Sequence, residues 1–416
     1  MNSTTNILKP LLLSATIATL LAGCGESTTS KEGDNFGGSD PVVTPTPPTT
    51  GFNETNLLSN LTDNVITPAY QAFDALTQEQ ELAVINYCEN PDPQTLQAAQ
   101  DSWRNAMAKW QQIEVMQIGP LTENSSTLRN NIYSWPVVSS CGVDQDVMYF
   151  EQGTINSAPY DITKRTASRR GLDALEYLLF NSITEHSCTS AKEVLNPWAS
   201  KTDSERKISR CNFAVEVAKD LDNSADLLLQ KWSGSNGYAT TLKQAGQTNN
   251  SFATAHEGVN AISDALFYVD KMSKDRKLAT PLGLFSNSCG GVGSVCSNDV
   301  ESPYSDNSIA NLVNNLIGFK ALFNGEGSDS ENTLGFDDYL VDVNDSATST
   351  KILSDVQAAI DELQGYSDTL AQSINQDAAV AEETHTKVKK VTDQLKVDFI
   401  NSLALKLPQT AAGDND

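Results

Sequence analysis

The stretch VAKDLDNSADLLLQKW, residues 217–232, shows the pattern that decides the fold. Its core-forming side chains recur every three or four residues, as one face of a helix requires, and they are Val217, Leu221, Ala225, Leu228 and Trp232. Similar stripes run through residues 58–76, 352–370 and 388–403. Pro68 must kink the first of these helices or begin its second part. Because alternating runs typical of strands are nearly absent, the sequence predicts an all-α protein.

A stretch rich in Gly, Asn and Thr, residues 233–250, divides the helical body into two similar lengths, 54–245 and 246–408. It is either a domain boundary or a long interhelical loop. Residues 409–416 read as a polar tail.

Composition limits the partners of the chain. It has 416 residues, 28 Lys and Arg against 53 Asp and Glu, and a net charge of −25. Phosphate binding relies on basic side chains, so we expect no nucleic-acid partner and no basic patch for anionic lipid. With 39% hydrophobic and 19% charged residues the chain reads as globular, and its acidity favours solubility.

The N-terminus indicates export. Lys9 precedes an apolar run, Leu11–Leu21, that is too short to span a bilayer permanently and is typical of a secretory signal in residues 1–23. The sequence Leu21-Ala22-Gly23-Cys24 resembles a bacterial lipobox, which implies cleavage before Cys24 and acylation of its sulfur and amino group. An ordinary signal peptide is the alternative.

Residues 24–53, rich in Gly, Ser, Thr and Pro, read as a disordered linker behind the lipidated Cys24. Gly25 stands where an inner-membrane retention signal carries Asp, which favours an outer-membrane lipoprotein facing the periplasm or the cell surface. The expected membrane contact is therefore the lipid anchor.

Six further cysteines predict disulfides, because an even number in an exported chain is typical of an oxidised framework. Sequence order favours the local pairs Cys88–Cys141, Cys188–Cys211 and Cys289–Cys296. A zinc site is disfavoured, since no Cys-x-x-Cys occurs and the chain has only three histidines. These are isolated, and we expect them on the surface or satisfied in the core: His186, His256 and His385.

One carboxylate of the predicted helix 93–118 shares a face with large apolar residues. Glu114 follows Trp103, Met107 and Trp110 at helical spacing. A buried carboxylate must be paired, protonated or bound to a ligand. Glu114 either pairs with a structural partner, Arg104 or Arg129, or has a functional role, and the sequence leaves both alternatives open.

Two further carboxylates, those of Asp173 and Glu176, lie three residues apart on the helix predicted after Gly171. A metal ion with hard oxygen ligands would bridge the pair, whereas Arg169 and Arg170 would neutralise Asp173 in the structural alternative.

The acidic stretch 329–345 lacks the EF-hand spacing and reads as a solvated loop, with calcium as a minor alternative. Its acids include Asp337, Asp338, Asp342 and Asp345.

The segment Gly171-Leu-Asp173-Ala-Leu-Glu176-Tyr-Leu-Leu resembles the Gly-x-His-x-x-Glu signature of the imelysin-like family of exported bacterial proteins, with Asp173 in place of the histidine. Further blocks match in order: Trp103-Arg104, Trp110 to Glu114, Ile118-Gly119-Pro120, Tyr133-x-Trp135-Pro136, and residues 275–283 and 302–312. The last two resemble the predicted-lipoprotein branch, and the similarity spans about residues 54–408.

The resemblance implies two helical-bundle halves with a cleft between them and the signature near the cleft. The implied metal site comprises Glu114, Asp173 and Glu176, with further signature residues at Trp103, Trp110, Arg129, Trp135, Gly171 and Lys277. An aspartate in place of histidine shifts the preferred ion from zinc toward iron(III), calcium or magnesium, or leaves a site without metal.

The expected function is that of a binding lipoprotein in the acquisition of iron or another metal ion, acting with an uptake transporter or ligand. We assign no catalytic residue. The first alternative is a metallopeptidase, an older label of the family, although the chain has neither His-Glu-x-x-His nor Gly-x-Ser-x-Gly. The second is a surface lipoprotein that binds a protein or glycan without metal.

Overall fold

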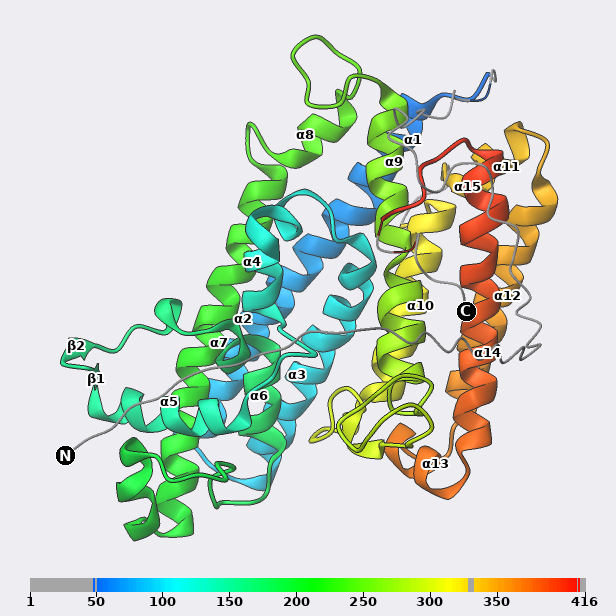
Figure 1. Ribbon diagram of the computed structural model, residues 1–416. Coiled ribbons are helices and arrows are strands. Elements are labelled where there is room, and N and C mark those ends of the chain that lie inside the picture. Colours follow the sequence, from blue (N-terminus) through cyan, green and yellow to red (C-terminus); the bar gives the residue numbers. More distant parts are fainter. Residues whose placement is uncertain (1–47, 49–50, 328–332, 410, 412–416) are drawn as a thin grey trace, which may run out of the picture. The chain divides into compact units, whose positions relative to one another are not determined.

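Helices form nearly all of the regular structure in the part of the chain that the computed structural model describes, residues 48, 51–327, 333–409 and 411 (Figure 1). The predicted signal peptide, Cys24, most of the linker and most of the polar tail lie outside these residues. The α-helices are α1 (Glu54–Asn60), α2 (Thr67–Glu89), α3 (Pro93–Ile113), α4 (Glu123–Ile132), α5 (Ser140–Gln152), α6 (Gly171–Phe180), α7 (Asp203–Ser233), α8 (Tyr238–Lys243), α9 (Ala255–Leu266), α10 (Ser308–Asn324), α11 (Phe336–Asp342), α12 (Ser346–Gln364), α13 (Leu370–Gln376), α14 (Ala378–Gln394) and α15 (Ile400–Ser402).

Shorter segments connect these helices. The π-helical segments are η1 (Leu61–Ile66), η7 (Val269–Ala279) and η9 (Leu395–Phe399). The 3₁₀ turns are η2 (Glu114–Met116), η3 (Gly119–Leu121), η4 (Ile162–Lys164), η5 (Ala167–Arg169), η6 (Glu193–Ser200) and η8 (Ser297–Asp299). The strands β1 (Thr154–Ile155) and β2 (Ala158–Pro159) pair as a small antiparallel hairpin. The all-α prediction is confirmed.

Local sequence signals fix where the helices begin. Pro68 lies in the first turn of α2, directly after the π-helical segment η1, so the second part of a helical run that begins at α1 starts there. Asp92 caps α3 by accepting hydrogen bonds from the backbone N–H groups of Gln94 and Thr95, at 2.7 and 2.9 Å.

The helices α2, α3, α6 and α7 pack together as a first bundle (Figure 1). α7 lies along α2, and α6 contacts both α7 and α3. The stripe at residues 217–232 faces inward as the spacing predicts, because Val217, Leu221 and Trp232 are fully buried. The Trp232 ring meets Tyr70 of α2 edge to face, with ring centroids 5.1 Å apart.

A second bundle comprises η7, α10, α12 and α14 (Figure 1). α10 packs against α12 on one side and against α3 of the first bundle on the other. Gly318 permits that approach, since a Cβ there would lie 2.4 Å from the carbonyl oxygen of Gln112. The stretch between the bundles contains the short helix α8.

The stretch predicted as an acidic loop is partly helical. Residues 328–332 lie outside the described residues, but Asp337, Asp338 and Asp342 belong to α11. Asp345 caps α12 by accepting a hydrogen bond from the Thr348 N–H at 3.2 Å. The loop prediction is therefore wrong for Asp337, Asp338 and Asp342, whereas Asp345 lies in the short connection before α12.

The predicted disulfide pairing is wrong for two of the three bonds. The structure joins Cys88 to Cys211 and Cys141 to Cys188, in place of Cys88–Cys141 and Cys188–Cys211, whereas Cys289–Cys296 is as predicted. Sequence order is a poor guide here because helix packing decides which cysteines meet. The end of α2 lies beside α7, which brings Cys88 and Cys211 to a Cα–Cα distance of 5.5 Å although they are 123 residues apart.

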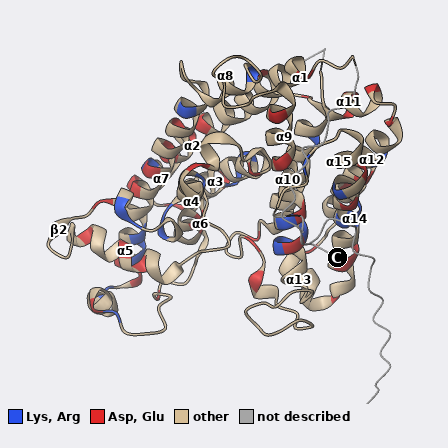
Figure 2. Cartoon of the chain, turned by 45° about the horizontal axis from the view of Figure 1, so that its top comes forward, with Lys and Arg blue, Asp and Glu red and all other residues tan. Residues whose placement is uncertain are grey.

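Charged side chains are spread over most of the described helices, with Lys and Arg scattered among Asp and Glu (Figure 2). Among the described residues, no helix combines the length and apolar character that a membrane crossing requires. His256 is buried with both ring nitrogens satisfied, Nδ1 at 2.6 Å from Glu54 Oε1 and Nε2 at 3.1 Å from the Ala404 carbonyl oxygen. The prediction of a satisfied core position is confirmed for this histidine.

Candidate functional site

Gly171 sets the position of the helix that carries both signature carboxyls. Its φ of +71° is a left-handed conformation that favours glycine. An added Cβ would also lie 2.4 Å from the Ile132 carbonyl oxygen and 2.5 Å from that of Asn131. Only glycine therefore lets the start of α6 meet the end of α4 and the segment after it.

That close approach gives Asp173 its hydrogen-bond donors. Its Oδ2 accepts from the Ser134 N–H at 2.7 Å, the Ser134 hydroxyl at 3.0 Å and the Trp135 N–H at 3.2 Å. Asp173 is only 8% exposed. Burial raises the pKa of its carboxyl to about 7, although the hydrogen bonds from Ser134 lower it.

Glu176, almost one turn further along α6, is held by a segment far away in the sequence. Its Oε1 accepts from the backbone N–H groups of Tyr304 and Ser305, both at 3.0 Å, and from the Ser305 hydroxyl at 2.8 Å. Burial raises the pKa of Glu176 to about 8, opposed by the Ser305 hydrogen bonds and assisted by the nearby Asp173 charge. One carboxyl of the first bundle thus depends on a loop that leads into the second.

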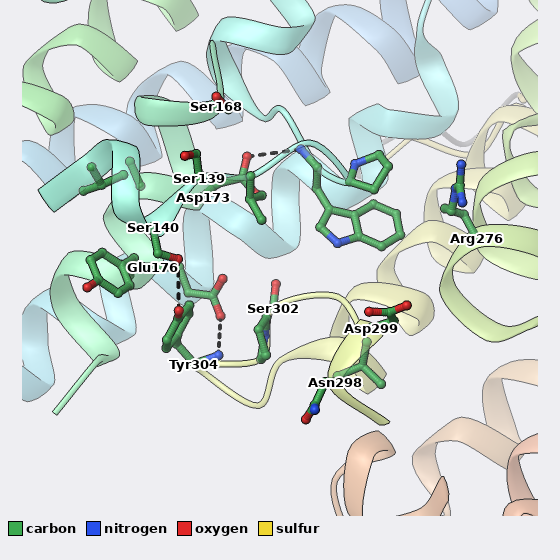
Figure 3. A pocket seen from close by; sticks show the side chains of 18 of the residues that line it. Ser139, Ser140, Ser168, Asp173, Glu176, Arg276, Asn298, Asp299, Ser302 and Tyr304 are labelled. Carbon is green, nitrogen blue, oxygen red and sulfur yellow. Dashed lines mark hydrogen bonds between the residues drawn. The ribbon is translucent and has the colours of Figure 1, made fainter. Parts of the chain in front are cut away.

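Both carboxyls line a cavity of about 260 Å³. Figure 3 shows them at one end, with Arg276 and Asp299 at the other. The remaining lining residues include Trp135, Pro136, Ser139, Ser140, Ser168, Tyr177, Thr280, Asn298, Ser302 and Tyr304. The hydrogen bonds within the described structure use Asp173 Oδ2 and Glu176 Oε1. Asp173 Oδ1 and Glu176 Oε2 therefore remain for a ligand.

A buried polar cluster behind the cavity holds the 298–305 segment in place. Glu301 is fully buried and accepts hydrogen bonds from the Tyr133 hydroxyl at 2.6 Å and the Gln111 side-chain amide at 3.1 Å. Lys277 Nζ lies 2.9 Å from Glu301 Oε2 and donates to Gln111 and Asn315 at 2.6 and 2.7 Å. Burial lowers the pKa of Lys277. The cluster ties the backbone donors for Glu176 to α3, η7 and α10.

A second cluster surrounds Glu114, which is fully buried. Arg129 donates to both its oxygens, Nε to Oε1 at 3.2 Å and Nη2 to Oε2 at 3.1 Å, and the Tyr268 hydroxyl also donates to Oε2. Arg129 Nη1 donates to the Trp135 carbonyl oxygen at 3.2 Å. The Glu114–Arg129 ion pair therefore stabilises the turn at residues 134–135, whose N–H groups donate hydrogen bonds to Asp173.

The three predicted metal ligands do not converge. Asp173 and Glu176 share the cavity, but Glu114 is absent from its lining because Arg129 and Tyr268 engage its carboxylate elsewhere. Of the two structural partners proposed for Glu114, Arg129 is confirmed. Arg104 instead pairs with Asp101 at 3.1 Å.

The structural alternative for Asp173 is also wrong. Arg170 pairs with Asp220 and Arg169 with Asp146, so neither neutralises Asp173. Backbone and hydroxyl donors from the segment after α4 take that place, because Gly171 brings α6 against it.

Two of the three signature tryptophans, Trp103 and Trp110, have packing roles. The Trp103 indole N–H donates to the Leu172 carbonyl oxygen at 2.9 Å, which fixes α3 to the first turn of α6. Trp110 is fully buried with its ring centroid 5.2 Å from that of Phe73. Neither lines the cavity.

Sequence reasoning missed Ser134, Ser305, Glu301 and Arg276. The first two act largely through backbone N–H groups, which leave no residue-type signal in a sequence. Glu301 lies just before the block 302–312, and Arg276 lies beside Lys277 in the block 275–283. Those two sequence blocks are the signals that point to the segments containing Glu301 and Arg276.

The imelysin family model, peptidase M75, matches residues 66–397. The chain belongs to the imelysin family. It is 26% identical over 276 residues to iron-regulated protein A of Synechococcus elongatus, and the matched region is 65% of each chain. The alignment thus spans slightly less than two thirds of that relative.

Solved structures share the imelysin fold. A protein described as an iron-regulated protein A precursor from Parabacteroides distasonis superposes with a TM-score of 0.64 at 17% identity, covering 85% of this chain and 96% of the other. An imelysin-like protein from Psychrobacter arcticum gives a TM-score of 0.59 at 16% identity, covering 86% and 99%. At these identities the likeness concerns the fold.

Proposed function

We propose that this imelysin-family protein is a non-catalytic binding component in the acquisition of iron or another metal ion, and that its cargo occupies the cavity beside Asp173 and Glu176. The supporting observation is the shared geometry of the two carboxyls. Each has one oxygen fixed by three hydrogen bonds and the other left for a ligand. Carboxylate oxygens suit hard cations such as iron(III), calcium and magnesium.

The donor set is smaller than a complete metal cage. Within the described ranges, no group of three or more His, Cys, Asp or Glu side chains is arranged to hold a metal ion. Hard cations take about six oxygen ligands or more. Asp173 and Glu176 therefore fit a cargo ion that keeps most of its ligands, whether water or an organic chelator, and not a resident ion bound by protein alone.

The setting we propose is the bacterial cell envelope, with a lipid anchor on Cys24 and residues 24–53 as the spacer. Three disulfides suit an oxidising compartment. The similarity to a protein named for iron regulation supports an iron-related role. An uptake transporter or a soluble iron carrier would then be the partner.

The proposal is tested with the chain from residue 25 onward, purified without its signal segment. Equilibrium dialysis followed by elemental analysis would measure bound metal for iron(III) supplied as its citrate, and for calcium and magnesium. We expect about one equivalent of one cargo in the unmodified protein, and at least about tenfold weaker binding in Asp173→Asn and Glu176→Gln.

The control is Glu382→Gln, which removes an exposed carboxylate from α14 and should bind as the unmodified protein does. Equal binding by all four proteins, or none by any, would overturn the proposal. Zinc-dependent cleavage of unfolded casein by the same preparation would support the metallopeptidase alternative instead.

A further inference from the structure

Arg276 differs from every other arginine in the chain. The sequence has eight arginines, all within the described residues. The other seven each pair with a carboxylate: Arg104, Arg129, Arg165, Arg169, Arg170, Arg206 and Arg210. Arg276 is exposed and has no ion pair or hydrogen bond within the described structure, although the chain carries a net charge of −25.

The position of this unpaired guanidinium is informative. Arg276 is on η7 and lines the same cavity as Asp173 and Glu176, at the opposite end in the view of Figure 3. It precedes Lys277, whose buried ammonium is anchored to Glu301, Gln111 and Asn315. The backbone at Arg276 is therefore held in place beside the cavity.

No acid that lines the cavity forms an ion pair with Arg276 within the described structure. The acid at that end is Asp299, whose oxygens accept from the Ser288 N–H at 2.7 Å and the Ser288 hydroxyl at 2.6 Å. The remaining polar lining includes hydroxyls and an amide, from Ser139, Ser168, Ser302 and Asn298. Such groups donate hydrogen bonds to anionic oxygens.

We infer that the cavity takes a metal ion as an anionic chelate of hydroxycarboxylate type, with a carboxylate of the chelator bound by Arg276 and the hydroxyl-rich lining. The inference rests on the proposed function, because it assigns the ligand class of the same cavity. A volume of about 260 Å³ is far larger than one ion and lies near the lower end of small-molecule sites, about 300–1,000 Å³.

The chelate accounts for both ends of the cavity. The two open carboxyl oxygens supply too few ligands for a hard cation, so the chelator provides the rest. Its outward carboxylate then meets a guanidinium, whose planar donors match carboxylate geometry in a bidentate hydrogen bond. A bare hydrated cation would gain nothing from Arg276 and would be repelled by it.

The test compares three probes by isothermal titration calorimetry: iron(III)–citrate, citrate alone and calcium chloride. The variants are Arg276→Gln, and Lys390→Gln, which removes the same charge from an exposed position on α14 outside the cavity. We expect Arg276→Gln to weaken iron(III)–citrate binding about tenfold or more. The Lys390→Gln protein should bind as the unmodified one does.

The outcomes separate the two proposals. If iron(III)–citrate binds equally well to Arg276→Gln and the unmodified protein but is lost in Asp173→Asn, the chelate inference is wrong and the proposed function stands. If calcium binds and iron(III)–citrate does not, the cargo is a bare cation and the inference is again wrong. Citrate alone binding as tightly as its iron complex would make the ligand an anion without metal. Failure of every probe would overturn both proposals.

Discussion

The Glu114–Arg129 pair offers the sharpest test of the structural reasoning. Glu114 is fully buried and its Arg129 partner has a side chain that is 10% exposed. Replacing Glu114 by Leu leaves a buried guanidinium and the Tyr268 hydroxyl without their acceptor. Replacing Arg129 by Met leaves a buried carboxylate. The double variant Glu114→Leu/Arg129→Met removes both charges.

The expected magnitudes follow from burial. Breaking a buried pair by removing one partner costs about 3–5 kcal/mol, so each single variant should lose that much unfolding free energy. The double variant leaves only neutral groups without a partner, such as the Tyr268 hydroxyl and the Trp135 carbonyl, and should lose about 1–3 kcal/mol. For roughly 355 residues at about 2.1 cal/mol/K each, 3–5 kcal/mol corresponds to a fall in Tm of about 4–7 °C.

The assay is urea unfolding of all four proteins followed by far-ultraviolet circular dichroism, with differential scanning calorimetry to test two-state behaviour. Coupling makes the loss in the double variant smaller than the sum of the two single losses. If the loss in the double variant equals the sum of the two single losses within about 0.5 kcal/mol, the reasoning is refuted. Single losses below about 1 kcal/mol would refute it as well.

Three further predictions concern the cavity and the disulfides. Because burial raises the folded-state pKa of Asp173 to about 7 and of Glu176 to about 8, and unfolded carboxyls ionise near pH 4, the folded state holds more protons between those values. The free energy of unfolding should therefore fall from pH 5 to pH 7, by up to about 1.4 kcal/mol per pH unit for each group. The decline should be shallower in Asp173→Asn/Glu176→Gln. Urea unfolding at several pH values measures it, and an equal dependence of the free energy on pH in both proteins would contradict this. Gly171→Ala should destabilise the protein by more than about 1 kcal/mol, measured by calorimetry, because alanine is strained at positive φ, and an unchanged Tm would count against it. Peptide mapping without reductant should recover Cys88 linked to Cys211, and a Cys88–Cys141 peptide would contradict the structure.

Local patterns predict the helices well because their causes are local. Apolar spacing places Val217, Leu221 and Trp232 on the buried face of α7, and Pro68 lies in the first turn of α2. The burial of Glu114 follows from its stripe, and Arg129 is one of the two partners the sequence suggests. These inferences need only the helical period and the cost of burying a charge.

Long-range contacts escape the same reasoning. Arg169 and Arg170 are near Asp173 on the sequence, yet each pairs with an acid on another helix. Glu176 depends on N–H groups of Tyr304 and Ser305, which lie more than a hundred residues away and whose side chains do not reveal the contact. Convergence of α6 with the 298–305 segment is a property of helix packing, and the helical period carries no information about it.

The bond between Cys88 and Cys211 changes what a protease can do to this protein. It closes a covalent ring of the chain that contains Glu114, Arg129, Asp173 and Glu176. The exposed segment 189–192 lies inside this ring and is the kind of site where proteolytic nicking occurs. A single cut there would leave both pieces tethered, so the carboxyls would stay attached to the rest of the molecule until the disulfide is reduced.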